Sequence, residues 1–132
     1  MSPRAEPPEQ RPLVIVVDDD GAVCNSLKFS LEVEGFAVRT YSSVGELLSD
    51  PDPETSSCLV VDFNLPGMSG LEAIAVLRAR RVLVPAILIT THPSPAVRER
   101  AAQAAVPIVE KPFLGNALLD QIRIALDHCR HV

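Results

Sequence analysis

Apolar residues follow two patterns that alternate from one end of this chain to the other. Short runs rich in apolar and β-branched residues are typical of buried β-strands, and they lie at residues 13–17, 36–41, 58–61, 86–89 and 106–109. After each run, apolar residues recur at the spacing of an amphipathic helix, within residues 23–31, 44–48, 71–77, 92–104 and 114–126. The pattern predicts five strands that alternate with five helices. Because the fourth helical segment contains few large apolar residues, we expect it to be weakly anchored.

Alternation of strands and helices indicates a parallel sheet, because each right-handed crossover buries its helix against a face of the sheet. We therefore expect an α/β fold of the (βα)5 type, a doubly wound five-stranded parallel sheet, over residues 13–128. Residues 1–12 contain four prolines and no hydrophobic period, which is typical of a disordered N-terminal arm. Residues 129–132 are expected to form a short C-terminal tail.

Polar residues stand where four of the apolar runs end. The run 58–61 ends at Asp62, and a Ser-x-x-Glu capping box at Ser69 and Glu72 then predicts a new helix. The other three runs end at Asp18, Asp19 and Asp20, at Thr90 and Thr91, and near Lys111. Ligands of such sheets bind outside the carboxyl ends of the strands. These side chains are therefore predicted to converge on one edge of the sheet.

The residue types at this edge suit the chemistry of a phosphoryl group. Carboxylates held close together repel one another, and a hard cation with few protein ligands plus water, which favours Mg²⁺ over Ca²⁺, relieves that repulsion. Lys111 can supply a positive charge and Thr90 a hydrogen-bond donor to phosphoryl oxygens. Asp62 is then the predicted nucleophile, and its attack on phosphorus forms an aspartyl phosphate.

Composition and charge narrow the classes of function. The 132 residues are 47% apolar and carry a net charge of -5, which suits one domain with one core and argues against nucleic acid binding by the domain itself. No apolar run reaches the about 18 residues of a membrane span, and the N-terminus is not signal-like, so a cytoplasmic location without membrane contact is expected. Cys24, Cys58 and Cys129 share no metal-type spacing and are expected to be reduced, structural thiols.

Four motifs, in this order and at this spacing, resemble the receiver domain of two-component response regulators. They are VVDDD at 16–20, VVDFNLPGMSG at 60–70, ILITT at 87–91 and EKPF at 110–113. The resemblance extends from Leu13 to about His128. It implies a flavodoxin-like sheet with strand order 2-1-3-4-5 and phosphorylation of Asp62 with the help of Thr90 and Lys111. It also implies a signalling domain that catalyses only its own phosphorylation and dephosphorylation, not an enzyme.

The same resemblance implies ligands and partners. Asp19 and Asp62 would bind Mg²⁺ directly, Asp18 would act partly through water, and the backbone carbonyl of Asn64 would complete the protein ligands. A cis peptide bond would precede Pro112. The phosphodonor would be a sensor histidine kinase or a phosphotransfer protein within a phosphorelay. A homodimer would form through the fourth helix, fifth strand and fifth helix.

Three positions depart from the family pattern. Ile108 stands three residues before the lysine, where an aromatic residue is common, and Ala104 appears in the sequence where a glycine usually follows the fourth helix. Pro107, expected within the fifth strand, removes a backbone donor and suggests an edge position or a bulge. We expect these changes to leave phosphorylation intact and to weaken its coupling to the output surface.

Two other function classes fit part of the sequence. Asp18, Asp20 and Gly21 resemble the D-x-D-G opening of haloacid-dehalogenase-type phosphatases, in which Asp18 would be the nucleophile. That interpretation leaves Asp62 without a role and finds Ala22 where the family has Thr or Val. The second alternative is a receiver-like interaction module that is never phosphorylated, which the three departures would suit.

Overall fold

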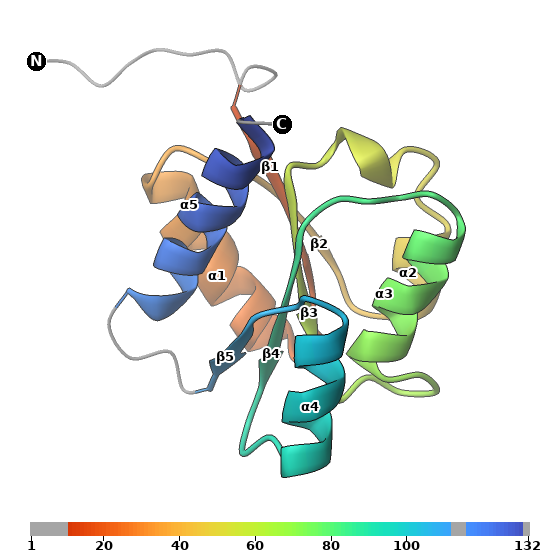
Figure 1. Ribbon diagram of the computed structural model, residues 1–132. Coiled ribbons are helices and arrows are strands. Elements are labelled where there is room, and N and C mark those ends of the chain that lie inside the picture. Colours follow the sequence, from red (N-terminus) through yellow and green to blue (C-terminus); the bar gives the residue numbers. More distant parts are fainter. Residues whose placement is uncertain (1–10, 112–115, 131–132) are drawn as a thin grey trace, which may run out of the picture.

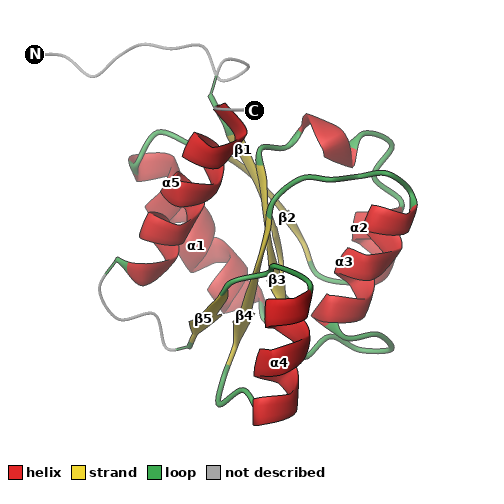
Figure 2. Cartoon of the chain, viewed as in Figure 1, coloured by secondary structure: helices red, strands yellow, loops and turns green. Residues whose placement is uncertain are grey.

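A parallel sheet of five strands runs through the centre of the molecule (Figures 1 and 2). The computed structural model describes residues 11–111 and 116–130. The strands are β1 (Leu13–Val17), β2 (Ala37–Tyr41), β3 (Cys58–Asp62), β4 (Ala86–Thr90) and β5 (Ile108–Glu110). Their order in the sheet is β2-β1-β3-β4-β5, and every neighbouring pair is parallel. The predicted α/β fold and its strand order are confirmed.

Helices cover both faces of this sheet (Figure 1). The α-helices are α1 (Gly21–Val33), α2 (Val44–Leu48), α3 (Gly70–Ala79), α4 (Pro95–Gln103) and α5 (Ala117–Arg130). Helices α1 and α5 lie on one face, while α2, α3 and α4 lie on the other. None of the described helices is long and apolar enough to cross a membrane. Most of the predicted N-terminal arm lies outside the described residues. Helix α5 extends to Arg130 and so includes the first two residues of the predicted C-terminal tail, while residues 131–132 lie outside the described part.

Strand β1 shows how the sequence forms two cores from one sheet. Ile15 and Val17 pack in the core beneath α2 and α3, while Val14 and Val16 pack in the core beneath α1 and α5. Side chains alternate between the two faces of a strand, so a continuous aliphatic run is apolar on both sides. All five residues of β3 are buried as well. The central strands are therefore fixed from both faces, and their carboxyl ends have defined positions.

Helix α4 ends in a left-handed residue that lies one position after Ala104. Ala104 has a φ of -87°, and the residue in the left-handed conformation is Ala105, with a φ of 57°. The Ala105 N–H donates to the carbonyl of Ala102, and the Val106 N–H donates to that of Ala101. These two bonds form a Schellman motif, which favours glycine at the left-handed position. The residue that adopts the left-handed conformation after α4 is therefore an alanine, Ala105.

Two further expectations differ from the structure. Pro107 precedes β5 instead of lying within it, and its carbonyl accepts the N–H of Leu88 at 2.9 Å. β5 is nevertheless an edge strand, as the proline suggested. The prolines and acidic residues within 49–57 predict a surface loop, but this segment contains a short 3₁₀ helix (Pro53–Thr55) whose first residue is buried. This loop therefore contributes to packing.

Candidate functional site

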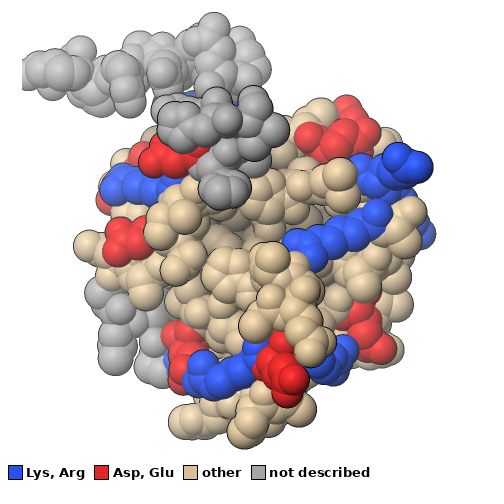
Figure 3. All heavy atoms as spheres, in the orientation of Figure 1, with Lys and Arg blue, Asp and Glu red and all other residues tan. Residues whose placement is uncertain are grey.

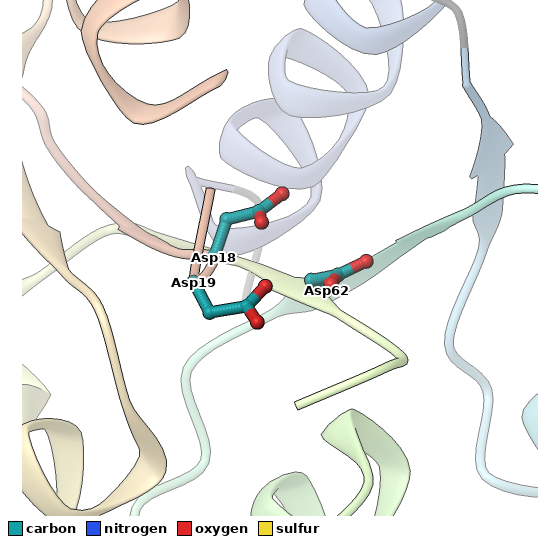
Figure 4. Close-up of side chains that lie close together, drawn as sticks. All are labelled: Asp18, Asp19 and Asp62. Carbon is teal, nitrogen blue, oxygen red and sulfur yellow. The ribbon is translucent and has the colours of Figure 1, made fainter. Parts of the chain in front are cut away.

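Asp18, Asp19 and Asp62 lie together at the carboxyl edge of the sheet (Figure 4). Asp18 follows β1, Asp62 is the last residue of β3, and the two strands pair directly with Val17 opposite Val61. One carboxylate oxygen from each aspartate lies within 4.8 Å of the others. Asp18 and Asp62 are buried, while Asp19 is exposed. The structure therefore brings together the three carboxylates that the sequence predicted.

Lys111 reaches this cluster from the end of the edge strand β5. It follows β5, and its N–H donates to the carbonyl of Thr90 at 2.8 Å. Its Nζ lies 2.8 Å from Oδ2 of Asp18 and 3.2 Å from Oδ1 of Asp62. The lysine side chain is 20% exposed, so these ion pairs are only partly open to water. Lys111 thus places one positive charge between two buried carboxylates.

The charges at this edge are only partly balanced. Burial raises the pKa of Asp62, the nearby charge of Asp18 raises it further, and Lys111 lowers it only in part. Burial lowers the pKa of Lys111, but its hydrogen bond to Asp18 and the charge of Asp62 outweigh this, so its pKa is raised overall. One ammonium group faces three carboxylates. A cation bound by the oxygens of these carboxylates would relieve the repulsion that remains among them.

The donor atoms at this edge fit a magnesium ion. Carboxylate oxygens are the ligands that this hard cation prefers, and the exposed side chain of Asp19 leaves the cluster open to water on one side. Asn64 is exposed and lies two residues beyond Asp62, and its carbonyl remains a predicted ligand.

The segment between β3 and α3 fixes the position of Asp62. The Phe63 N–H donates to the carbonyl of Ile89 at 2.9 Å, and the Gly70 N–H donates to the carbonyl of Phe63 at the same distance. Ser69 and Glu72 form the predicted capping box at the start of α3. The chain that follows Asp62 is therefore tied to the neighbouring strand and to the next helix.

Cys24 is a contact of the site that the sequence did not reveal. Its Sγ donates to the backbone carbonyl of Asp18 at 3.2 Å from the buried face of α1. Burial raises the pKa of this thiol, and the charge of Asp18 raises it further. Cys24 and Cys58 are buried thiols, as predicted. The sequence signal that could have indicated this contact was the position of Cys24 on the apolar face of the helix that begins after Asp20.

Thr90 lies at the same edge as the acidic cluster. It is the last residue of β4, is 2% exposed and stands opposite Glu110 of β5. His92, two residues later, is exposed and has a φ of 51°. The Lys111–Pro112 peptide bond, predicted to be cis, lies outside the described residues. The position of Thr90 agrees with the prediction, while its role in the chemistry remains a prediction.

Comparison with known proteins identifies a family for nearly the whole chain. Residues 14–123 match the family model described as the response regulator receiver domain. The chain is 38% identical over 120 residues to the transcriptional regulatory protein FixJ of Azorhizobium caulinodans, a match that covers 90% of this chain and 56% of FixJ. The chain thus spans about half the length of the curated relatives it matches.

Solved structures show the same relationship. The crystal structure of FixJ-N is 34% identical, with a TM-score of 0.80, and the match covers 90% of this chain and 96% of that one. The response regulator StyR is 38% identical, with a TM-score of 0.81, over 89% of this chain and 60% of that one. Both the sequence and the fold of this chain are therefore similar to those of response regulators.

These matches decide between the classes of function left open by the sequence. The phosphatase interpretation based on Asp18 is wrong, because the matched family is that of receivers, and Asp18 is buried against Lys111 instead of serving as an open nucleophile. The acidic pocket of Asp18, Asp19 and Asp62 also favours a phosphoacceptor over an interaction module that is never phosphorylated. The chain belongs to the response regulator receiver domain family and is a FixJ-like phosphoacceptor switch, a signalling domain and not a true enzyme.

Proposed function

We propose that Asp62 accepts the phosphoryl group and that Asp18, Asp19, Asp62 and the backbone carbonyl of Asn64 hold Mg²⁺ during the reaction. The observation that carries this proposal is the meeting of three carboxylates and Lys111 at one edge of the sheet. Asp62 is the central member, because it ends β3, in the middle of the sheet.

In this reaction, a carboxylate oxygen of Asp62 forms a bond to phosphorus while the bond from phosphorus to the donor's leaving group breaks. Lys111, now paired with Asp18 and Asp62, donates hydrogen bonds to the phosphoryl oxygens. The hydroxyl of Thr90 donates a hydrogen bond to the same group. Bound Mg²⁺ would neutralise charge on the transferred group. Since the remaining contribution is positioning, the fixed main chain at Asp62 is central to the rate.

The proposed donor is the phosphohistidine of a sensor kinase or a phosphotransfer protein, and the proposed location is the cytoplasm. A homodimer through α4, β5 and α5 is part of the proposal, and a shallow groove lined by Arg98, Ala101, Pro107 and Ile108 lies on that surface. In Figure 3, acidic and basic side chains lie side by side in a band across the lower part of the visible face, where Figure 1 shows α4. Mixed charge of this kind suits the pairing of two copies.

Intact-mass analysis after incubation with acetyl phosphate and Mg²⁺ tests the assignment of Asp62. We expect one phosphoryl adduct on the wild type and none on Asp62→Asn. Asp52→Asn is the matched control, because this exposed aspartate makes no side-chain cap at its own helix and should leave the adduct intact. An adduct that persists in Asp62→Asn would disprove the assignment.

Thermal unfolding with and without Mg²⁺ tests the metal site separately. An ion that binds only the folded protein stabilises it by RT ln(1 + [L]/Kd), about 2.7 kcal/mol at a hundredfold excess over Kd. The wild type should show this increase, and Asp19→Asn should lose it, because a neutral amide replaces a negatively charged carboxylate ligand. An equal Mg²⁺ response in both proteins would place the ion elsewhere.

The proposed output depends on Ile108, which stands opposite Leu88 and packs against the core beneath α4. A β-branched side chain is stiff at χ1 and cannot present a ring first to the core and then to the surface. Phosphorylation should therefore change Thr90 and the following loop more than the surface beside Ile108. Amide exchange with and without a phosphoryl mimic tests this in wild type and Ile108→Tyr. Equal changes around β5 in both proteins would contradict the proposal.

A further inference from the structure

Gly70 makes an unusually close approach to the main chain of the phosphoacceptor. A Cβ atom at this position would lie far inside the normal van der Waals contact distance from the carbonyl oxygen of Asp62. It would also lie 3.0 Å from the carbonyl carbon of Asp62 and 3.0 Å from Cδ1 of Leu88. Two of these three neighbours are backbone atoms, which cannot move aside as a side chain can. Any larger residue must therefore displace either Asp62 or the start of α3.

The start of α3 is itself held in place, so it cannot yield freely. The Gly70 N–H donates to the carbonyl of Phe63, and the capping box of Ser69 and Glu72 closes the first turn. Leu71, the next residue, is buried in the core. The hydrogen bond between Phe63 and Gly70 thus closes the segment between β3 and α3 into a loop. The bare α-carbon of this glycine sets the separation between β3 and α3.

We infer that Gly70 is a positioning residue for phosphorylation, which fixes the main chain of Asp62 so that its carboxylate faces Asp19 and Lys111. The inference rests on the proposed role of Asp62. Gly70, the first residue of α3, would affect phosphorylation of Asp62 through its contact with the backbone carbonyl of Asp62. Glycine is required at this position for space and not for a left-handed conformation, because only Gly35 and Gly67 among the described glycines have a positive φ.

The test is Gly70→Ala, compared with Gly45→Ala. At Gly45 the added Cβ would meet only Oγ of Ser43, at an ordinary 3.7 Å. We expect Gly70→Ala to bind Mg²⁺ about tenfold or more weakly, the range typical of lost support for a metal ligand, and to be phosphorylated correspondingly more slowly. Gly45→Ala should match the wild type in both. Unchanged Mg²⁺ affinity in folded Gly70→Ala would overturn the inference.

A second substitution identifies which neighbour matters. Leu88→Val removes the Cδ1 atom and with it the side-chain part of the clash in Gly70→Ala. Because the clash with the Asp62 carbonyl remains, the double variant should stay defective in Mg²⁺ binding. Recovery of wild-type affinity would show that only core packing was at stake, which overturns the inference. If Gly70→Ala does not fold, Ser69→Ala combined with Glu72→Ala removes both hydrogen bonds of the capping box and so loosens the start of α3 without adding atoms. Unchanged Mg²⁺ affinity in that variant would also overturn the inference.

A readout without metal separates this inference from the proposed function. The ¹³C chemical shift of the Asp62 carbonyl reports the contact directly and should change in metal-free Gly70→Ala but not in Gly45→Ala. If the wild type neither binds Mg²⁺ nor gains a phosphoryl group, the proposed function fails while the shift change still demonstrates the contact. If the wild type is phosphorylated and Gly70→Ala has both a normal shift and a normal rate, the positioning role fails alone.

Discussion

Helices α3 and α4 cover the same face of the sheet and each follows a strand end that carries a site residue, yet the fold holds them differently. Helix α3 follows Asp62 and buries five residues, including Leu71, Ile74 and Leu77. Helix α4 follows Thr90 and buries only Ala101. The residue that must hold its geometry is beside the firmly packed helix. The residue proposed to move during switching is beside the loosely packed one.

Helix α4 is nevertheless tied down at one end. Nη1 of Arg78, near the end of α3, donates to the carbonyl of Ala104 at 2.5 Å. At the other end, Ser94 caps the helix, and farther along Arg98 forms an exposed ion pair with Glu110 of β5. Exposed ion pairs contribute little to stability, about 0–1 kcal/mol. The C-terminal end of α4 is therefore better fixed than the end that follows Thr90.

The largest expected difference between the two helices is in core truncation. Leu77 of α3 is 1% exposed, so Leu77→Ala should lower the free energy of unfolding by about 3 kcal/mol. Val97 is the largest apolar side chain of α4 and only partly buried, so Val97→Ala should cost about 1 kcal/mol or less. Urea denaturation measures both values. Equal losses would show that α4 is as firmly packed as α3.

A smaller effect on stability comes from the buried charge of Asp62, the residue that precedes the firmly packed helix α3. Burial raises the pKa of Asp62 above its unfolded value, so the ionised carboxylate destabilises the folded state. The protonated carboxyl of Asp62 favours the folded state. This stabilisation is fully present below the ordinary carboxyl pKa and is lost as the pH rises through the raised pKa of the folded protein. Metal-free Asp62→Asn should therefore be more stable than the wild type at neutral pH. This advantage should shrink as the pH falls into the carboxyl range.

Asp50→Asn is the matched control for this pH dependence. Asp50 accepts hydrogen bonds from Arg39 at 2.8 Å and from Tyr41 at 2.5 Å, so its carboxylate is paired with donors. Removing that charge should destabilise the protein at neutral pH, opposite to the effect at Asp62. Melting curves over a pH series distinguish the two. A wild type more stable than metal-free Asp62→Asn at neutral pH would mean that Lys111 more than compensates the buried charge.

Much of this architecture could be predicted from local patterns. Aliphatic runs marked the strands, and the polar residues that ended them marked the site, because a strand that leaves the core exposes its next residues at the sheet edge. The capping box at Ser69 and Glu72 was also readable, since its two side chains act within one turn. Lys111 and Asp18, far apart in sequence, were placed together by topology and by resemblance to receivers.

Other features depend on contacts that no local pattern encodes. The left-handed residue after α4 is Ala105 and not Ala104, and neither alanine marks that position in the sequence as a glycine would. The close approach of Gly70 to Asp62 requires the whole β3–α3 connection to be in place. The contact of Cys24 with the carbonyl of Asp18 likewise arises only once α1 packs on the sheet. These contacts refine the site after the fold has formed it.

The ends of α3 and α4 offer a smaller, directly paired comparison. Arg81 and Ala105 occupy the same left-handed position after the two helices, with φ values of 68° and 57°. Replacing either with glycine relieves a strained conformation and should raise the free energy of unfolding by about 0.5–1 kcal/mol. Ala104→Gly is the control and should lower it, because Ala104 has a φ of -87°. A gain from Ala104→Gly with none from Ala105→Gly would show that Ala104, and not Ala105, is the left-handed residue.

The smallest effect on global stability is expected at the serine that caps α4. Ser69 and Ser94 have the same role, since each accepts a backbone N–H three residues later. Loss of such a cap costs about 1 kcal/mol when the helix is part of the cooperative core. Ser69→Ala should therefore lower the urea midpoint measurably. Ser94→Ala should leave that midpoint almost unchanged and accelerate amide exchange in the first turn of α4, because a segment with few buried contacts opens locally before the whole domain unfolds. Equal midpoint losses for the two alanines would show that α4 unfolds only with the core, and the proposed mobility beside Thr90 would then lack a physical basis.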